Sequence, residues 1–350
     1  MKSNYEPLGK HIRLVDYRNS EEVTSTVLGI SIDKEFMPSV ANVIGTDLSR
    51  YKLISKGLFA CNPMHVGRDE RLPIALYEKD NAAIVSPAYF MFEIIDRDVL
   101  NEEYLMMWFR RPEFDRECWF MTDGSVRGGI SWDDLCRIQL PVPPYERQLD
   151  VVESYRAITR RIAMKKEIND NLEAVLAASH SKMFFSKDTS EHSKLGELMT
   201  FGNGKSRPKT DGPIPVYGGN GVLSYTDHHN IENAVLIGRV GAYCGSVYLE
   251  QGICWVSDNA IFAKSKTTKD EFFDYFLLKR LNLFNHHVGT GQQLLTQEIL
   301  NNIEVPKPGT EQIELFNRKA TSIFETIFTN SREIIRLQEL SDLLLSRLAG

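Results

Sequence analysis

The side chains with the clearest potential for recognition chemistry are basic, amide and aromatic residues in a turn-rich stretch of the second half of the chain. They are Lys205, Arg207, Lys209, Tyr217, Asn220 and Tyr225. Arginine and asparagine can bond the edges of guanine and adenine, lysine suits phosphate, and turns on a sheet can carry such residues into a DNA groove. For any one of them, a solvated loop position without a ligand is the alternative interpretation.

An arginine between glycines is the second candidate. The segment Gly238-Arg239-Val240-Gly241 precedes Tyr243, and its glycines would let the backbone approach another surface closely. The first half has a related segment with Arg68 and Arg71, which two acidic residues separate. These arginines would either contact DNA or tie their own turns to neighbouring carboxylates.

No catalytic, cofactor or metal site is predicted. The five cysteines form no CxxC pair, and the histidine pairs at 228–229 and 286–287 lack a partner at ligand spacing. The glycine-containing segments 201–204 and 289–291 do not combine a strand, a third glycine and a helix start, as a nucleotide-binding loop requires. Residues 142–145, Val-Pro-Pro-Tyr, end like the motif of amino-methyltransferases, but valine cannot accept hydrogens from a target amine. A structural linker is the better interpretation.

Composition limits the partners of the chain. It has 350 residues and a formal net charge of −6, whereas a protein that bound DNA by phosphate attraction alone would carry a basic excess. A locally basic face or a basic partner would therefore be needed. No apolar run approaches the roughly 20 residues of a membrane helix, and the amino terminus lacks a signal-peptide hydrophobic region. We therefore expect a cytoplasmic protein without membrane contact.

The elements that position these residues occur twice. Features of the first half recur in the same order in the second, for example Gly67-Arg68 as Gly238-Arg239 and Ile138 as Ile303. This duplication predicts two similar α+β domains, residues 1–145 and 190–310. β-branched and aromatic runs predict strands at 83–85, 89–94 and 234–237, and helical spacing of apolar residues predicts helices at 102–110 and 270–281.

Each domain is followed by a long amphipathic segment, residues 146–189 and 311–350, whose apolar positions alternate at spacings of three and four. The predicted helix-pairing residues are Val151, Ile158, Ile162, Asn169, Leu172, Ile323, Ile327, Asn330, Ile334 and Leu337. Two seams in register indicate a coiled coil. An antiparallel arrangement would relate the halves by a pseudo-twofold axis and set Asn169 opposite Asn330, where facing amides can satisfy each other. Two separate helices that each cap their own domain are the alternative.

The chain resembles the specificity subunit of type I restriction-modification systems over essentially its whole length. The residues that carry the resemblance are Leu8-Gly9 with Leu195-Gly196, Gly238-Arg239-Val240-Gly241, Gly289-Thr290-Gly291-Gln292-Gln293 with Gly124-Ser125-Val126-Arg127, and the proline-rich segments 140–144 and 305–308. No single motif is decisive, but their duplicated order is specific. Arg127 and Gln292 thereby join the candidates for DNA contact.

The resemblance implies two target-recognition domains that each read one half of a bipartite double-stranded DNA target. The helices between them would act as a spacer and dock two methyltransferase subunits. S-adenosylmethionine, ATP and Mg would belong to partner subunits, cleavage would belong to a motor and nuclease subunit, and this chain would be non-catalytic. A two-domain coiled-coil scaffold that binds protein ligands and a self-contained methyltransferase are the rival hypotheses. The sequence does not predict the bases read or the spacer length.

Overall fold

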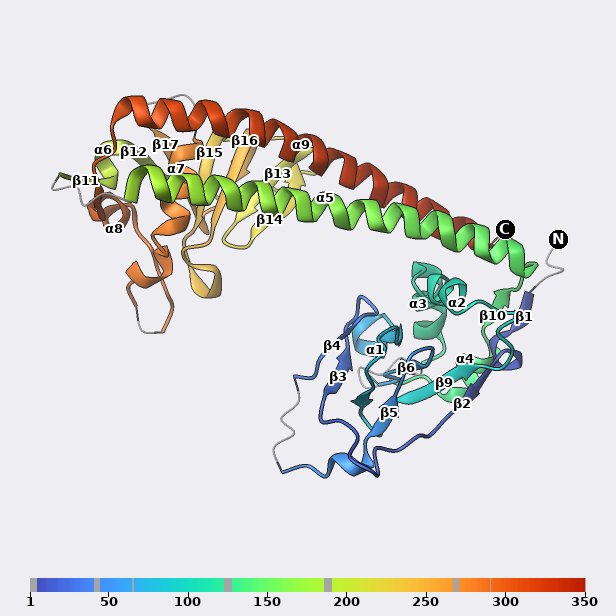
Figure 1. Ribbon diagram of the computed structural model, residues 1–350. Helices are drawn as coiled ribbons and strands as arrows, with labels where there is room; N and C mark the ends of the chain where they lie inside the picture. Colours follow the sequence, from blue (N-terminus) through green and yellow to red (C-terminus); the bar gives the residue numbers. More distant parts are fainter. Residues whose placement is uncertain are drawn as a thin grey trace. The chain divides into compact units, whose positions relative to one another are not determined.

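The computed structural model describes residues 5–40, 45–64, 66–122, 128–185, 191–266, 271–289 and 291–349. The chain divides into two compact units, Met1–Met164 with Glu333–Gly350, and Lys165–Arg332. Each unit mixes helices with small sheets and contains a stretch of both long helices (Figure 1). The fold is therefore of the predicted α+β kind.

The first unit contains two four-stranded sheets. One has the order β2 (Ile12–Leu14), β9 (Phe90–Ile94), β6 (Phe59–Cys61), β7 (Ile74–Leu76), and the other β4 (Phe36–Pro38), β3 (Val27–Ile30), β8 (Ala83–Val85), β5 (Lys52–Ile54). A further pair joins β1 (Tyr5–Pro7) to β10 (Gln139–Pro141). The helices are η1 (Leu8–Lys10), η2 (Leu48–Arg50), α1 (Val66–Asp69), α2 (Glu102–Phe109), α3 (Pro112–Phe120) and α4 (Trp132–Arg137).

The second unit is built on one six-stranded sheet. Its order is β12 (Met199–Asn203), β17 (Ala260–Ser265), β15 (Ile231–Gly238), β16 (Val247–Val256), β13 (Ile214–Gly218), β14 (Gly221–Thr226). β11 (His192–Lys194) pairs with β18 (Glu304–Pro306) as β1 does with β10. The helices are α6 (Leu195–Leu198), η3 (Gly241–Tyr243), α7 (Phe272–Arg280), η4 (Leu283–His286) and α8 (Gln297–Asn302).

The strands and short helices predicted from hydrophobic spacing are present. Strands occupy 83–85, 90–94 and 231–238, and helices occupy 102–109 and 272–280. Local chemistry explains the start of α2, since the side chain of Asn101 accepts hydrogen bonds from the backbone N–H groups of Glu103 and Tyr104. Each unit contains two clusters of buried apolar residues, and the larger cluster of the first unit includes Phe59, Phe92 and Phe109.

The long helices are α5 (Tyr145–Phe185) and α9 (Thr310–Ser346), which ends in η5 (Arg347–Ala349). In the first unit Val152 of α5 shares a core with Leu345 of α9, and Arg161 forms an ion pair with Glu333. The residue numbers rise along one helix as they fall along the other, so the helices are antiparallel there. None of the ten predicted helix-pairing residues is exposed.

The second unit contains the polar interruption of this helix pair. Asn330 Nδ2 donates to Asn169 Oδ1 at 2.9 Å, so the predicted contact is present. Lys165 Nζ also donates to Asn330 Oδ1 at 2.9 Å, and Asn169 Nδ2 donates to Ser331 Oγ at 3.3 Å. Four side chains therefore form a connected polar group within an otherwise apolar seam.

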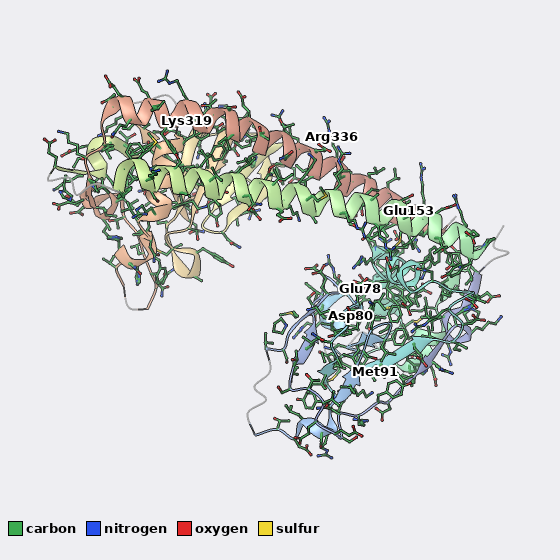
Figure 2. The ribbon with its side chains drawn as sticks, viewed as in Figure 1. Glu78, Asp80, Met91, Glu153, Lys319 and Arg336 are labelled. Carbon is green, nitrogen blue, oxygen red and sulfur yellow. The ribbon has the colours of Figure 1, made fainter. Side chains whose placement is uncertain are left out.

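The outer faces of the long helices carry charge. Glu153 of α5 and Lys319 and Arg336 of α9 are exposed (Figure 2). In the part of the chain that the structure describes, no helix is long and apolar enough to cross a membrane.

Candidate nucleic-acid interface

Two glycine-containing segments that are far apart in the sequence meet in the second unit. The segment after β15, residues 238–245, is bonded to the segment 288–295 through its backbone. Gly241 N–H donates to Gln293 O at 3.0 Å, and Leu295 N–H donates to Arg239 O at 2.9 Å. The structure therefore joins two of the motifs that carry the family resemblance.

The turn between β16 and β17, residues 257–259, is the common contact of three further segments. Arg239 N–H donates to Asn259 O at 3.0 Å, and Ser257 N–H donates to Tyr217 O at 2.8 Å. Lys205 forms an isolated bridge with Ser257. The loops after β12 and β15 and the end of β13 are thus brought together around one turn.

Glycine is required where these loops touch. A Cβ atom at Gly204 would collide with the carbonyl oxygen of Ser257, and one at Gly238 would collide with that of Tyr243. Because both obstacles are backbone atoms, no side chain can move to make room. These glycines therefore fix the close approach of the loops on which the candidate residues stand.

The basic cluster of the second unit is available to a ligand. Lys205, Arg207 and Lys209 are all exposed, and none forms an ion pair or side-chain hydrogen bond with another described residue. They form a locally basic cluster on a chain with a formal net charge of −6. Four further candidates are also exposed, namely Asn220 and Gln292 in turns, Tyr225 on β14 and Tyr243 in η3.

Two of the predicted residues differ from this group. Tyr217 is half-buried, and its hydroxyl donates to Glu250 Oε2 at 3.0 Å; burial, followed by the nearby Glu250 carboxylate, raises the pKa of Tyr217. The Arg239 guanidinium makes one long contact, from Nη1 to Asp258 O at 3.5 Å, and its buried Nε lacks a partner within the described residues. The hydroxyl of Tyr217 is therefore engaged within the protein, whereas the terminal nitrogen atoms of Arg239 make only this one long contact.

The first unit repeats the backbone contact but not the charge. Gly67 N–H donates to Gly128 O at 3.0 Å, which joins the segments that correspond to 238–245 and 288–295. Arg68, however, bonds Asp69 through two nitrogen atoms, and Arg71 bonds Asp33 at 3.2 Å. Both arginines are exposed but neutralised by these carboxylates. Arg127 lies outside the described residues.

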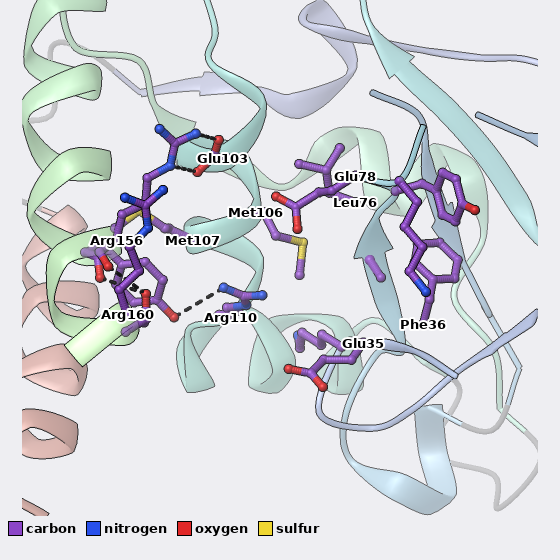
Figure 3. A pocket seen from close by; sticks show the side chains of 16 residues that line it. Glu35, Phe36, Leu76, Glu78, Glu103, Met106, Met107, Arg110, Arg156 and Arg160 are labelled. Atoms are coloured by element: carbon purple, nitrogen blue, oxygen red, sulfur yellow. Dashed lines mark hydrogen bonds and ion pairs between the residues drawn. The ribbon is translucent and has the colours of Figure 1, made fainter. Parts of the chain in front are cut away.

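A cleft in the first unit was not predicted. It has a volume of about 570 Å³, and its lining includes Arg110, which directly follows α2, and Arg156 and Arg160 of α5 (Figure 3). The sequence places residue 110 and residue 160 in different segments, and only the packing of α2 against α5 brings them together. Elsewhere in the described ranges, no group of three histidine, cysteine or carboxylate side chains is placed to hold a metal ion.

Comparison with protein families supports the resemblance for the second half of the chain. Residues 187–343 match the family model described as the type I restriction modification DNA specificity domain. This range covers the basic cluster, the Gly-Arg segment and most of α9. No curated protein sequence gives a significant match to the chain.

Comparison with solved structures covers the full length. The S subunit of a type I restriction-modification system from M. genitalium is 14% identical with a TM-score of 0.61, over 98% of this chain and 95% of that chain. This similarity shows that the fold is shared. The HsdS subunit from Thermoanaerobacter tengcongensis is 16% identical over 98% of this chain and 95% of that chain, but its TM-score of 0.38 is too low to support an argument.

Proposed function

We propose that this chain, whose residues 187–343 match the type I restriction modification DNA specificity domain, is the DNA-recognition subunit of such a system. The observation that carries the proposal is the meeting of the family motifs with a free basic cluster in the second unit. Backbone contacts hold the loops of Lys205 and Arg239 around one turn. A surface of this kind can contact phosphates and base edges together.

The two kinds of contact have different roles. Lys205, Arg207 and Lys209 would neutralise phosphates, which positions the domain and makes binding depend on salt. Arg239 would bond a base edge, because its terminal nitrogen atoms make only one long contact and it follows Gly238, where a side chain would collide with backbone. Asn220 and Gln292 are further candidates for base contacts because both amides are exposed in the same loop group.

The duplication supports a bipartite target, with one half read by each domain. The antiparallel helices α5 and α9 would set the spacer and dock two methyltransferase subunits, and motor and nuclease subunits would join through the complex. S-adenosylmethionine, ATP and Mg would be bound by those partners, and this chain would have no catalytic site of its own. The M. genitalium protein that shares the fold is an S subunit of a type I system, which supports this division of roles.

The decisive experiment measures sequence-selective DNA binding with and without a co-expressed methyltransferase subunit. The methylated target is first found by sequencing DNA from cells that contain both proteins. We expect binding of a duplex that contains this target to exceed binding of a duplex with either half scrambled. A scaffold would bind neither duplex selectively, and a self-contained methyltransferase would modify DNA without the partner.

A further inference from the structure

The outer edge of β7 in the first unit has backbone groups free to bond another strand. β7 is the last strand of its sheet and pairs with β6 alone. Tyr77 bonds toward β6, since its N–H donates to Leu58 O at 2.8 Å and its C=O accepts from Gly57 N–H at 2.9 Å. Bonding direction alternates along an antiparallel strand, so the backbone groups of Leu76 and Glu78 point outward. Within the described ranges these groups have no backbone partner on that side.

This open edge borders the cleft of about 570 Å³. One wall is formed by α2 and by residues 155–160 of α5, and the other by β7 and residues 34–36 (Figure 3). Met106, Leu76 and Phe36 contribute apolar surface to the lining. An extended chain segment that entered the cleft would thus meet unpaired backbone groups and apolar side chains together, the two requirements of strand addition.

The helical wall favours acidic side chains. Arg156 is already neutralised by Glu103, the acidic residue that lines this wall. Arg110 donates to the neutral hydroxyl of Tyr155 at 3.3 Å, and Arg160 is exposed with no partner among the described residues. Two guanidinium groups therefore remain without a carboxylate at the same cleft.

The strand side of the cleft limits how acidic the ligand can be. Glu35 and Glu78 also line the cleft, and neither forms an ion pair with a described residue. They would repel a uniformly acidic ligand, and they also disfavour the phosphates of a nucleic acid. Because successive side chains of a strand point to opposite faces, a peptide can direct acidic residues to the arginines and place uncharged residues between them.

We propose that this cleft binds an extended segment of a second protein, in which acidic residues alternate with apolar ones, as an added strand on β7. The backbone groups of Leu76 and Glu78 bond the segment, and Arg110 and Arg160 bind its carboxylates. This interaction is separate from the proposed DNA contacts, because the cleft lining includes neither the basic surface of the second unit nor Arg68 and Arg71 of the first.

The test uses the full-length protein and a labelled eight-residue peptide that alternates glutamate and valine. Two matched peptides serve as controls, one with lysine in place of glutamate and one N-methylated at every residue, which cannot donate backbone hydrogen bonds from either edge. Fluorescence anisotropy measures affinity, and hydrogen exchange measures protection of residues 74–79. We expect the first peptide to bind at least tenfold more tightly than either control and to slow exchange in 74–79.

Variants then locate the site. Arg160→Glu removes a side chain without a described partner, so folding is unaffected, and it should weaken peptide binding at least tenfold. Glu78→Pro removes an outward N–H and should abolish protection of 74–79. Arg147→Gln, at an exposed position of α5 outside the cleft, is the matched control and should bind as the unchanged protein does. Equal binding of all three peptides, no binding at millimolar peptide, or displacement of the peptide by duplex DNA would each overturn the proposal.

Discussion

The two domains share a backbone contact between corresponding loops, but they surround it with opposite charge patterns. In the first, Gly67 N–H bonds Gly128 O, and the neighbouring arginine Arg68 is paired with Asp69. In the second, Leu295 N–H bonds Arg239 O, and three exposed cations nearby have no described ionic partner. Duplication has therefore preserved the loop geometry while the side chains that could face DNA have diverged.

A second comparison concerns how each long helix holds its domain. Gln148 of α5 is fully buried and accepts a hydrogen bond from Asn101 N–H at 2.9 Å, at the start of α2. Asn317 of α9 is also buried and accepts from Phe273 N–H at 2.9 Å, at the start of α7. Each repeat thus uses an amide of the long helix to satisfy an amino-terminal N–H group of a short helix.

The largest expected effect comes from breaking these amide contacts. Gln148→Leu removes bonds to three backbone groups, since the side chain also donates to Val99 O and Pro143 O. Buried groups left without a partner are costly, so we expect a loss of about 3 kcal/mol in the free energy of unfolding. Urea denaturation measures the loss, and hydrogen exchange should accelerate in α2 but not in α7. The reverse pattern is expected for Asn317→Leu, and acceleration in both helices by either variant would contradict the comparison.

The next largest effect, on DNA affinity, should distinguish the basic cluster of the second unit from the carboxylate-paired arginines of the first. Replacing Lys205, Arg207 and Lys209 by glutamine should lower affinity for target DNA by about ten- to a hundredfold and reduce the salt slope by about 0.9 for each phosphate that is no longer neutralised. The matched variant, with Arg68 and Arg71 replaced by glutamine, should change affinity much less, because carboxylates already neutralise both residues. Titrations at several salt concentrations measure both. Equal decreases in affinity from the two variants would show that the charge difference has no role in binding.

Periodic features were predictable from the sequence, and features that depend on tertiary packing were not. The seam spacing predicted the contact between Asn169 and Asn330 because a heptad pattern defines both the face and the register of a helix pair. The repeat also identified Arg68 as the counterpart of Arg239. Whether Arg68 forms an ion pair could not be predicted, since the side chain of the neighbouring Asp69 can point toward it or away. The cleft beside Arg160 depends on how α2 packs against α5.

A smaller effect, on the pH dependence of stability, should distinguish the first turns of α2 and α7. Asp274 of α7 is buried with Oδ2 unpartnered among the described residues, and burial, followed by the nearby Glu271 carboxylate, raises its pKa well above 3.8. The protonated form is therefore favoured, and stability present at low pH is lost as pH rises through the folded-state pKa. Asp274→Asn should remove this loss. The free energy of unfolding of the variant, relative to that of the unchanged protein, should therefore increase as the pH rises above about 4. Urea titrations at several pH values measure this difference.

Glu103 occupies the corresponding position of α2 and provides the control. Because it is paired with Arg156, Glu103→Gln loses an ion pair and should not stabilise the first unit at any pH. If Asp274→Asn showed no relative gain as the pH rose, the buried carboxyl would be ionised at little cost, and the proposed difference between the two helices would be wrong.

The smallest effect on stability is expected where α5 packs against α9. The two helices carry different residues at corresponding positions there. Lys165 and Asn169 of α5 correspond to Asn330 and Ile334 of α9. Replacing Asn169 and Asn330 by leucine removes both partners of one hydrogen bond, which can be neutral or stabilising, but it also removes the hydrogen bond from Lys165 Nζ to Asn330 Oδ1. These opposing changes should alter the free energy of unfolding by less than about 1 kcal/mol.

The register of α5 against α9 should loosen in the same variant, because apolar contacts are less directional than the amide pair. Urea denaturation measures the first effect, and crosslinking between cysteines introduced along α5 and α9 measures the second. A loss of several kcal/mol would mean that the polar group stabilises the helix pair directly and does not serve mainly to fix its register.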